Sequence, residues 1–283
     1  MVGKKIYNLC KELFPLNRSL TGNGNRNTLK ILKKHFKNLK IKEVRSGTKV
    51  FDWKIPNEWN VKDAWIKAPD GKIFANYKKN NLHLVGYSHK IKKKISFKSL
   101  VKKLHFIKNQ PSAIPYVTSY YNKNWGFCIS YNEYKNLKKS GNYEININSK
   151  LEKGSLTYGE ILIPGKSKKE IFLSTYICHP SMANNELSGP TVTIFLAKWI
   201  AQKKRKYSYR IIFIPETIGS IMYLSKYKNI LKKNVIAGFN VTCVGDNKSY
   251  SYVPSRNGDT LSDRVGLQVL KKINKKFKKF EWV

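Results

Sequence analysis

The sequence predicts an α/β protein in which a central sheet is flanked by helices and which carries an inserted β-rich domain. From residue 155 onward, buried strand-like runs alternate with helical runs, which is typical of a sheet between layers of helices. Residues 47–129 instead contain short strand-like pieces separated by turn signals. A chain of 283 residues can bury one large core and a smaller inserted unit. We therefore predict a discontinuous main domain, residues 1–46 and 130–283, interrupted by a domain over 47–129.

The first 46 residues predict two helices and a strand. Apolar residues at helical spacing indicate a helix over residues 3–14. A polar, glycine-containing loop over 17–24 precedes a second helix from about Arg26 to Phe36. Alternating polar and apolar residues then predict a strand from Leu39 to about Val44.

The inserted domain is predicted from its short strands and its turns. Strand-like pieces lie at residues 49–53 and 72–77. Between them, Pro69-Asp70-Gly71 predicts a turn, because proline presets φ and glycine accepts a positive φ. Three tryptophans are expected to anchor a small separate core, namely Trp53, Trp59 and Trp65.

The rest of the chain supplies the alternating pattern. Strands are predicted at residues 155–163, 170–177, 209–215, 235–244 and 249–253, and helices at 188–201, 218–227 and 261–277. The last helix ends in lysines, which suits the negative end of its dipole. Ligands of such folds collect at the carboxyl ends of the strands, so polar residues there are the functional candidates.

The formal charge of +38 at pH 7 by itself suggests a nucleic-acid or membrane partner. Of the 55 basic residues, however, 48 are lysine and seven are arginine, and recognition of phosphates and bases favours arginine. The lysines are spread along almost the whole chain together with many asparagines, isoleucines and tyrosines, as expected from an AT-biased genome. We expect loose, salt-sensitive binding to polyanions and no specific nucleic-acid site.

The lack of a predicted membrane span or signal peptide and the spacing of the cysteines together predict an intracellular protein without disulfides. No apolar run reaches the ~20 residues that span a bilayer, and the N-terminus has no signal-peptide pattern, so we expect a cytoplasmic protein without a membrane span. The four cysteines form no CxxC pair, which argues against a disulfide scaffold and a cysteine zinc knuckle. Cys178 and Cys243 lie in apolar runs and are expected to be small buried thiols.

Four residues that could hold or serve a metal lie at or shortly past the ends of predicted buried strands: His179, Glu186, Glu216 and Asp246. Only 17 of the 283 residues are acidic, so these carboxylates stand out. Zinc binds imidazole and carboxylate and keeps a position open for water. The metal lowers the pKa of that water, and an unligated carboxylate accepts its proton. Glu216 is the expected base, because Pro215 and Gly219 fix a tight turn around it.

Each of these residues also has an ordinary structural role open to it. A single histidine at a strand end is commonly a hydrogen-bonded structural residue. Glu186 and Ser188 could serve the N-terminus of the next helix, and Asp246 could belong to a turn. The common location of the four residues favours the metal site.

The run from Ser174 to Gly189 resembles a bacterial family of aminopeptidase-like proteins, which is related to the zinc-dependent aminopeptidases and often named alongside polysaccharide biosynthesis. Further stretches that resemble this family cover essentially the whole chain: residues 14–22, 50–53 with 56–60, 110–121, 213–220 and 254–260. The resemblance implies a zinc-peptidase-like, three-layer α/β/α fold with a mixed central sheet.

The resemblance also implies roles for single residues. His179 matches the first metal-binding histidine, and Glu216 matches the general base. Asn185 stands at the position of a bridging aspartate, and Thr217 stands where a second glutamate would bind metal. Thr242 falls near a later aspartate position.

From this resemblance we expect a site with one or two zinc ions. Its metal ligands are expected to be His179, Glu186 and Asp246, the last lying four residues beyond Thr242. The substrate is expected to contact Asn184, Asn185 and Arg256.

No histidine follows His179, although the family has a late one. Three interpretations stay open: the chain is a truncated member, its last ligand comes from elsewhere, or it is inactive. A truncated member would expose a sheet edge.

The first predicted function is a zinc-dependent aminopeptidase-like hydrolase of an amide or peptide bond in a small peptide-like or amino-sugar substrate. The alternative is a catalytically incomplete ligand-binding protein linked to polysaccharide biosynthesis. Either one could be a homo-oligomer.

Overall fold

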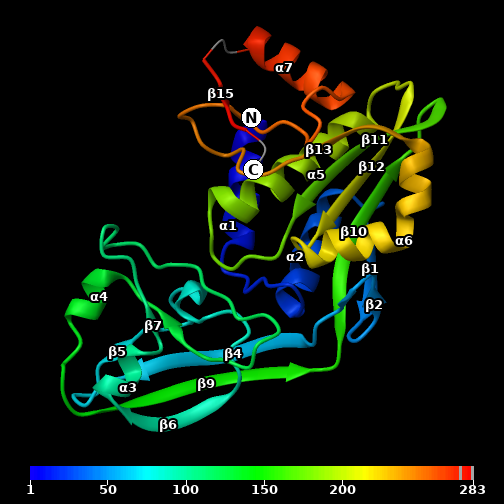
Figure 1. The fold of residues 1–283 in the computed structure, drawn as a ribbon. Helices are drawn as coiled ribbons and strands as arrows, with labels where there is room; N and C mark the ends of the chain where they lie inside the picture. The colour runs from blue at the N-terminus through cyan, green and yellow to red at the C-terminus, as the bar shows by residue number, and fades with distance from the viewer. Residues whose placement is uncertain (274–275, 282–283) are drawn as a thin grey trace.

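The computed structural model describes residues 1–273 and 276–281 and shows two lobes (Figure 1). The larger lobe contains a five-stranded sheet of order β1-β10-β12-β11-β13. The strands of this sheet are β1 (Lys40–Arg45), β10 (Ser155–Ile163), β11 (Ser167–Tyr176), β12 (Tyr207–Ile214) and β13 (Val235–Asn240). β11 runs parallel to β12 and β13, whereas β10 runs antiparallel to β1 and β12, so the sheet is mixed as expected.

Helices cover both faces of this sheet, which confirms the predicted fold class (Figure 1). One face is covered by α1 (Val2–Leu13), α2 (Asn23–His35) and α5 (Gly189–Ala201). Leu13, Leu32 and Ile194 of these helices are fully buried there. The other face is covered by α6 (Ile218–Asn234), whose Met222 and Tyr223 are almost fully buried against it.

The smaller lobe is built on a four-stranded antiparallel sheet of order β5-β4-β9-β6. Its strands are β4 (Glu58–Lys67), β5 (Ile73–Phe74), β6 (Ile91–Ser96) and β9 (Asn142–Glu152). Smaller elements of this lobe and of its connections are β2 (Lys49–Val50), β3 (Trp53–Lys54), η1 (Asn81–His83), α3 (Phe97–Val101), β7 (Leu104–His105), β8 (Phe127–Cys128) and α4 (Tyr131–Lys135). Because β9 pairs with both β4 and β6, this sheet draws on residues as far as 152. The domain boundaries at 47 and 129 therefore stay a proposal.

The expected separate core around three tryptophans is not observed. Trp59 is 3% exposed and belongs to an apolar cluster that also contains Ile212 and Ile214 of the large sheet. Trp53 lies at the surface in the β2–β3 hairpin, where it packs edge-on against Tyr121. Trp65 is half-buried. The two lobes thus share one continuous core, since buried residues of the small sheet and of the large sheet belong to the same apolar cluster.

Two further predictions need correction near the end of the chain. Cys178 is buried as expected, but Cys243 is exposed, because β13 ends at Asn240 and Cys243 follows in a loop with φ of 51°. The last helix, α7 (Leu261–Ile273), does not reach residue 277: residues 274–275 lie outside the described part, and the chain then forms β15 (Lys278–Lys279) beside β14 (Ser251–Tyr252). All four cysteines are free thiols. Within the described ranges, no helix combines the length and apolar character needed to cross a membrane.

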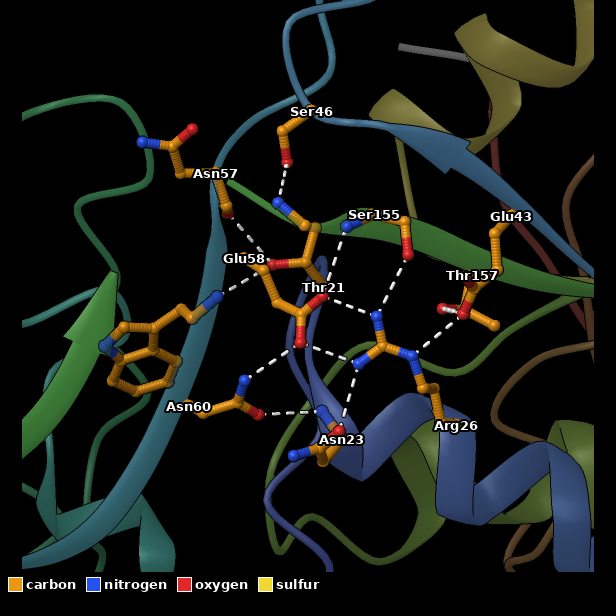
Figure 2. Close-up of polar contacts among 12 residues, drawn as sticks. Thr21, Asn23, Arg26, Glu43, Ser46, Asn57, Glu58, Asn60, Ser155 and Thr157 are labelled. Atoms are coloured by element: carbon orange, nitrogen blue, oxygen red, sulfur yellow. Dashed lines mark hydrogen bonds and ion pairs between the residues drawn. The ribbon is translucent and has the colours of Figure 1, made fainter. Parts of the chain in front are cut away.

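A polar cluster joins the two lobes where β4 begins (Figure 2). Arg26 of α2 forms a two-pronged ion pair with Glu58 of β4, with N–O distances of 2.6 and 2.5 Å. The Arg26 guanidinium also donates to Glu43 of β1 and to Ser155 of β10. Glu58 accepts further bonds from the Ser155 backbone and the Asn60 amide. Two strands of the large sheet and one of the small sheet are therefore tied to α2 at a single point.

Candidate metal centre

The parallel strands of the large sheet bring two predicted residues to the same edge. β11 and β12 are paired up to Tyr176 and Ile214, and the Ile177 backbone N–H then donates to the Ile214 carbonyl at 2.9 Å. His179 and Glu216, each two residues past this last contact, therefore emerge side by side. The two residues lie past the carboxyl ends of parallel strands, which is where ligands of such folds are expected.

His179 lies between two carboxylates that contact opposite sides of its ring. Its Nδ1 is 2.6 Å from Oε1 of Glu186, and its Nε2 is 3.5 Å from Oε2 of Glu216. The side chains of His179 and Glu186 are 7% and 0% exposed, whereas that of Glu216 is 48% exposed. The buried carboxylate thus fixes the ring, and the exposed one is open to water.

Glu186 is held in place by an unusual backbone. It belongs to the distorted turn η2 (Asn184–Ser188) and has φ of 72°, a conformation that side chains with a Cβ rarely adopt. Its second oxygen accepts the backbone N–H of His179 at 3.1 Å. The turn itself is fixed by Ser188, which donates to the Asn184 carbonyl and accepts the Val244 N–H. Such strain persists only where the surroundings fix it, and here it directs the carboxylate at His179.

Cys178 completes the group, although its sequence context predicted only a small buried thiol. Its Sγ is 3.4 Å from His179 Nδ1 and accepts the Glu216 backbone N–H at 3.1 Å. Burial raises the pKa of this thiol well above its ordinary value, and the nearby Glu186 adds to the effect. Cys178, His179, Glu186 and Glu216 offer donor atoms that all lie within 4.8 Å of one another. Adjacency to His179 was the only signal for Cys178 in the sequence.

The other predicted site residues are not brought into this group. Asp246 is exposed and accepts bonds from the Lys248 backbone and the Asn184 amide. The pKa of the Asp246 carboxyl group is lowered mainly by the bond from the Lys248 backbone, and the Asn184 bond adds to this effect. Asn185 is half-buried, and its Oδ1 has no hydrogen-bond partner among the described residues. Arg256 is exposed in the loop before α7.

Aromatic side chains from both lobes border the histidine. Tyr116, from the smaller lobe, packs on His179 with ring centroids 4.7 Å apart, and Tyr176 of β11 lies 6.0 Å away. Burial raises the pKa of Tyr176 to about 12, so its hydroxyl is protonated at neutral pH. A narrow cavity beside Pro180 is lined by Tyr116, Tyr120 and Trp59 among others. The sequence carries no sign that residues from the inserted segment border the site.

The donor types in this group are ones that zinc binds. Imidazole nitrogen, carboxylate oxygen and thiol sulfur are the groups that zinc binds in proteins. A histidine that binds zinc usually donates its other ring N–H to a carboxylate, and Glu186 is placed for that bond.

Comparisons with known proteins identify the family and the fold of the chain. A family model described as "Domain of unknown function (DUF4910)" matches residues 7–283. A Clostridium acetobutylicum protein named for polysaccharide biosynthesis and an aminopeptidase-like domain is 48% identical over 268 residues, which is 95% of this chain and 61% of that protein. A crystal structure of a C. acetobutylicum protein described as a peptidase has a TM-score of 0.95 at 46% identity and covers 99% of this chain and 66% of that one. The chain thus spans less than two thirds of these relatives.

A more distant structure shows the same fold. The zinc aminopeptidase of Bacillus subtilis has a TM-score of 0.64 at 11% identity, over 98% of this chain and 78% of its own. The likeness confirms an aminopeptidase-type α/β architecture.

Proposed function

The chain belongs to the family described as a domain of unknown function (DUF4910), and we propose that it provides the catalytic region of a zinc-dependent hydrolase of an amide or peptide bond. The observation that carries this proposal is the setting of His179. Its Nδ1 is held by a fully buried carboxylate, and its Nε2 faces an exposed one.

In this proposal the protein groups have separate roles. His179 would be one of the zinc ligands, binding through Nε2, and Glu186 would orient the ring through Nδ1 instead of serving as the ligand expected from the sequence. When bound, zinc lowers the pKa of a water molecule and polarises the substrate carbonyl. Glu216 is near enough to Nε2, and exposed enough, to accept a proton from a water molecule beside it and to return that proton to the leaving amine. Tyr116 excludes water from one side of His179.

The position of Asn185 supports one zinc ion in preference to two. An asparagine at the place of a bridging carboxylate lacks the negative charge that a metal pair needs, and Asp246 lies outside the group of close donors. The name of the C. acetobutylicum relative supports a substrate from polysaccharide assembly, such as a peptide-like or amino-sugar amide.

Metal analysis of the purified protein tests the proposal. We expect about one zinc per chain in the wild type and in Glu216→Gln, and loss of zinc in His179→Ala. With a panel of aminoacyl anilides and N-acylated amino sugars, Glu216→Gln should lower kcat by about 10²- to 10⁴-fold, the usual contribution of a general base. A wild-type protein that binds no zinc would refute the hydrolase.

The second candidate is a ligand-binding protein without catalytic activity. It is favoured by Asn185 and Thr217, which stand where the resemblance implies a bridging aspartate and a metal-binding glutamate. This candidate predicts saturable binding of the same compounds without turnover. Calorimetry alongside the activity panel separates the two functions.

A further inference from the structure

A buried arginine contacts the backbone of the proposed zinc ligand His179. Arg18, in the segment between α1 and α2, is 0% exposed. Its Nε donates to the backbone carbonyl of His179 at 3.0 Å. Neither of its terminal nitrogens has a hydrogen-bond partner among the described residues. The roles proposed above do not use this residue.

The charge of Arg18 has a counter-charge at the site. Glu186 is the strongest of the nearby groups that favour the charged form of the Arg18 guanidinium. An arginine in a protein stays protonated at neutral pH. An isolated buried ion is very unfavourable, so the 1%-exposed Glu186 and the buried Arg18 stabilise one another's charges.

The segment that carries Arg18 is fixed on both sides. The Phe14 carbonyl accepts the Ser181 hydroxyl at 2.9 Å, and the Pro15 carbonyl accepts the Asn81 amide at 3.2 Å. Gly24 packs so closely on this segment that an added Cβ would lie 1.9 Å from the Asn17 carbonyl oxygen. The arginine therefore sits on a rigid support.

Resting on the proposed function, we infer that Arg18 is a positioning residue of the zinc site. Arg18 fixes the backbone of His179 and balances the charge of Glu186. Glu186 therefore stays hydrogen-bonded to Nδ1 of His179, and Nε2 of His179 stays free for zinc. Arg18 acts on the site through the His179 backbone and through Glu186, so it is a positioning residue and not a catalytic one.

The test compares Arg18→Met and Arg18→Lys with Arg210→Met, which removes another buried arginine of the same lobe. Arg210 is 8% exposed and is paired with Glu160 and Glu170. Zinc affinity is measured by competition with a chelating dye, and folding by circular dichroism. We expect about 10- to 100-fold weaker zinc binding in Arg18→Met, the usual effect of losing an outer-shell partner. Arg18→Lys keeps the charge and should lose about three- to tenfold, whereas Arg210→Met should stay within about threefold of the wild type.

A second measurement separates this inference from the proposed function. In the metal-free protein, NMR of the histidine side chains, assigned with His179→Gln, reports which ring nitrogen of His179 carries the proton. We expect a stable Nδ1–H in the wild type and in Arg210→Met, and its loss in Arg18→Met. If the wild type binds no zinc, the proposed function fails while this signal still decides the role of Arg18. Unchanged zinc affinity and unchanged His179 signals in folded Arg18→Met, or in Arg18→Lys if the methionine variant does not fold, overturn the inference.

Discussion

The ion pair between Arg26 and Glu58 should contribute measurably to stability, unlike the ion pairs on the open surface. Glu58 is 10% exposed at its side chain and Arg26 is 22% exposed, and both N–O contacts are short (Figure 2). The guanidinium of Arg26 lowers the pKa of Glu58 from its ordinary 4.5 to about 2. By linkage this difference corresponds to at most about 3 kcal/mol. Water around the partly exposed guanidinium screens the pair, so we expect about 1–2 kcal/mol.

A double-mutant cycle measures this coupling directly. Arg26→Met, Glu58→Gln and the double variant are unfolded in urea at pH 7, and the same is done for the exposed pair Lys94 and Glu144. The control pair is 3.4 Å apart, with side chains 71% and 39% exposed, and should couple by less than about 0.5 kcal/mol. A coupling energy for Arg26 and Glu58 no larger than that of the control would refute the reasoning.

The pH dependence of the same variants gives an independent check. Because folding lowers the pKa of Glu58, its stabilisation is present in full above about pH 4.5 and is lost as the pH falls toward 2. The stability difference between wild type and Glu58→Gln should therefore shrink between pH 5 and pH 3. A difference that stays constant over this range would mean that the carboxylate charge contributes nothing.

Three other outcomes can be measured with the same material. Asp263→Asn should lower the free energy of unfolding by about 1–3 kcal/mol in urea titrations, because this carboxylate accepts five hydrogen bonds at the start of α7. Gly24→Ala should cost about 1–3 kcal/mol because the new methyl group would collide with the Asn17 carbonyl, whereas Gly3→Ala, with open space around it, should be neutral or stabilising by up to about 1 kcal/mol. Zinc at 100 times its Kd should stabilise the wild type by about 2.7 kcal/mol in thermal unfolding, and should leave His179→Ala unchanged.

The large sheet could be predicted from the sequence because its strands are continuous apolar runs. β10 matches its predicted bounds, and the strand that leads to His179 is correct to within a few residues. The small sheet was predicted less well. β9 alternates between buried and half-buried residues over most of its length but contains three asparagines, two glutamates and a lysine, so its sequence shows little of the apolar character that marks the other strands. Its partner β4 was missed for a similar reason, and the pairing of the two joins residues 77 to 94 positions apart.

The candidate site was predictable only where a strand end marked it. His179 and Glu216 follow parallel neighbours, so strand prediction alone places them together. The link from Glu186 to His179 depends on a left-handed backbone at a glutamate, which residue preferences do not foresee. Asp246 satisfied the strand-end rule as well, yet the loop after β13 directs it toward Asn184 and the Lys248 backbone. Strand position therefore identifies the edge of the site, and loop conformation decides which side chains enter it.

The segment from Phe14 to Gly22 contacts both the proposed site and the smaller lobe. At one end Arg18 holds the His179 backbone. At the other, Thr21 bonds to the Asn57 carbonyl, the Trp59 N–H and the Tyr87 hydroxyl of the smaller lobe. Since Tyr116 of that lobe also packs on His179, a movement of one lobe against the other would disturb the histidine from both sides. The shared core and the Arg26–Glu58 pair oppose such movement, so the stability of the lobe junction and the geometry of the proposed zinc site should change together.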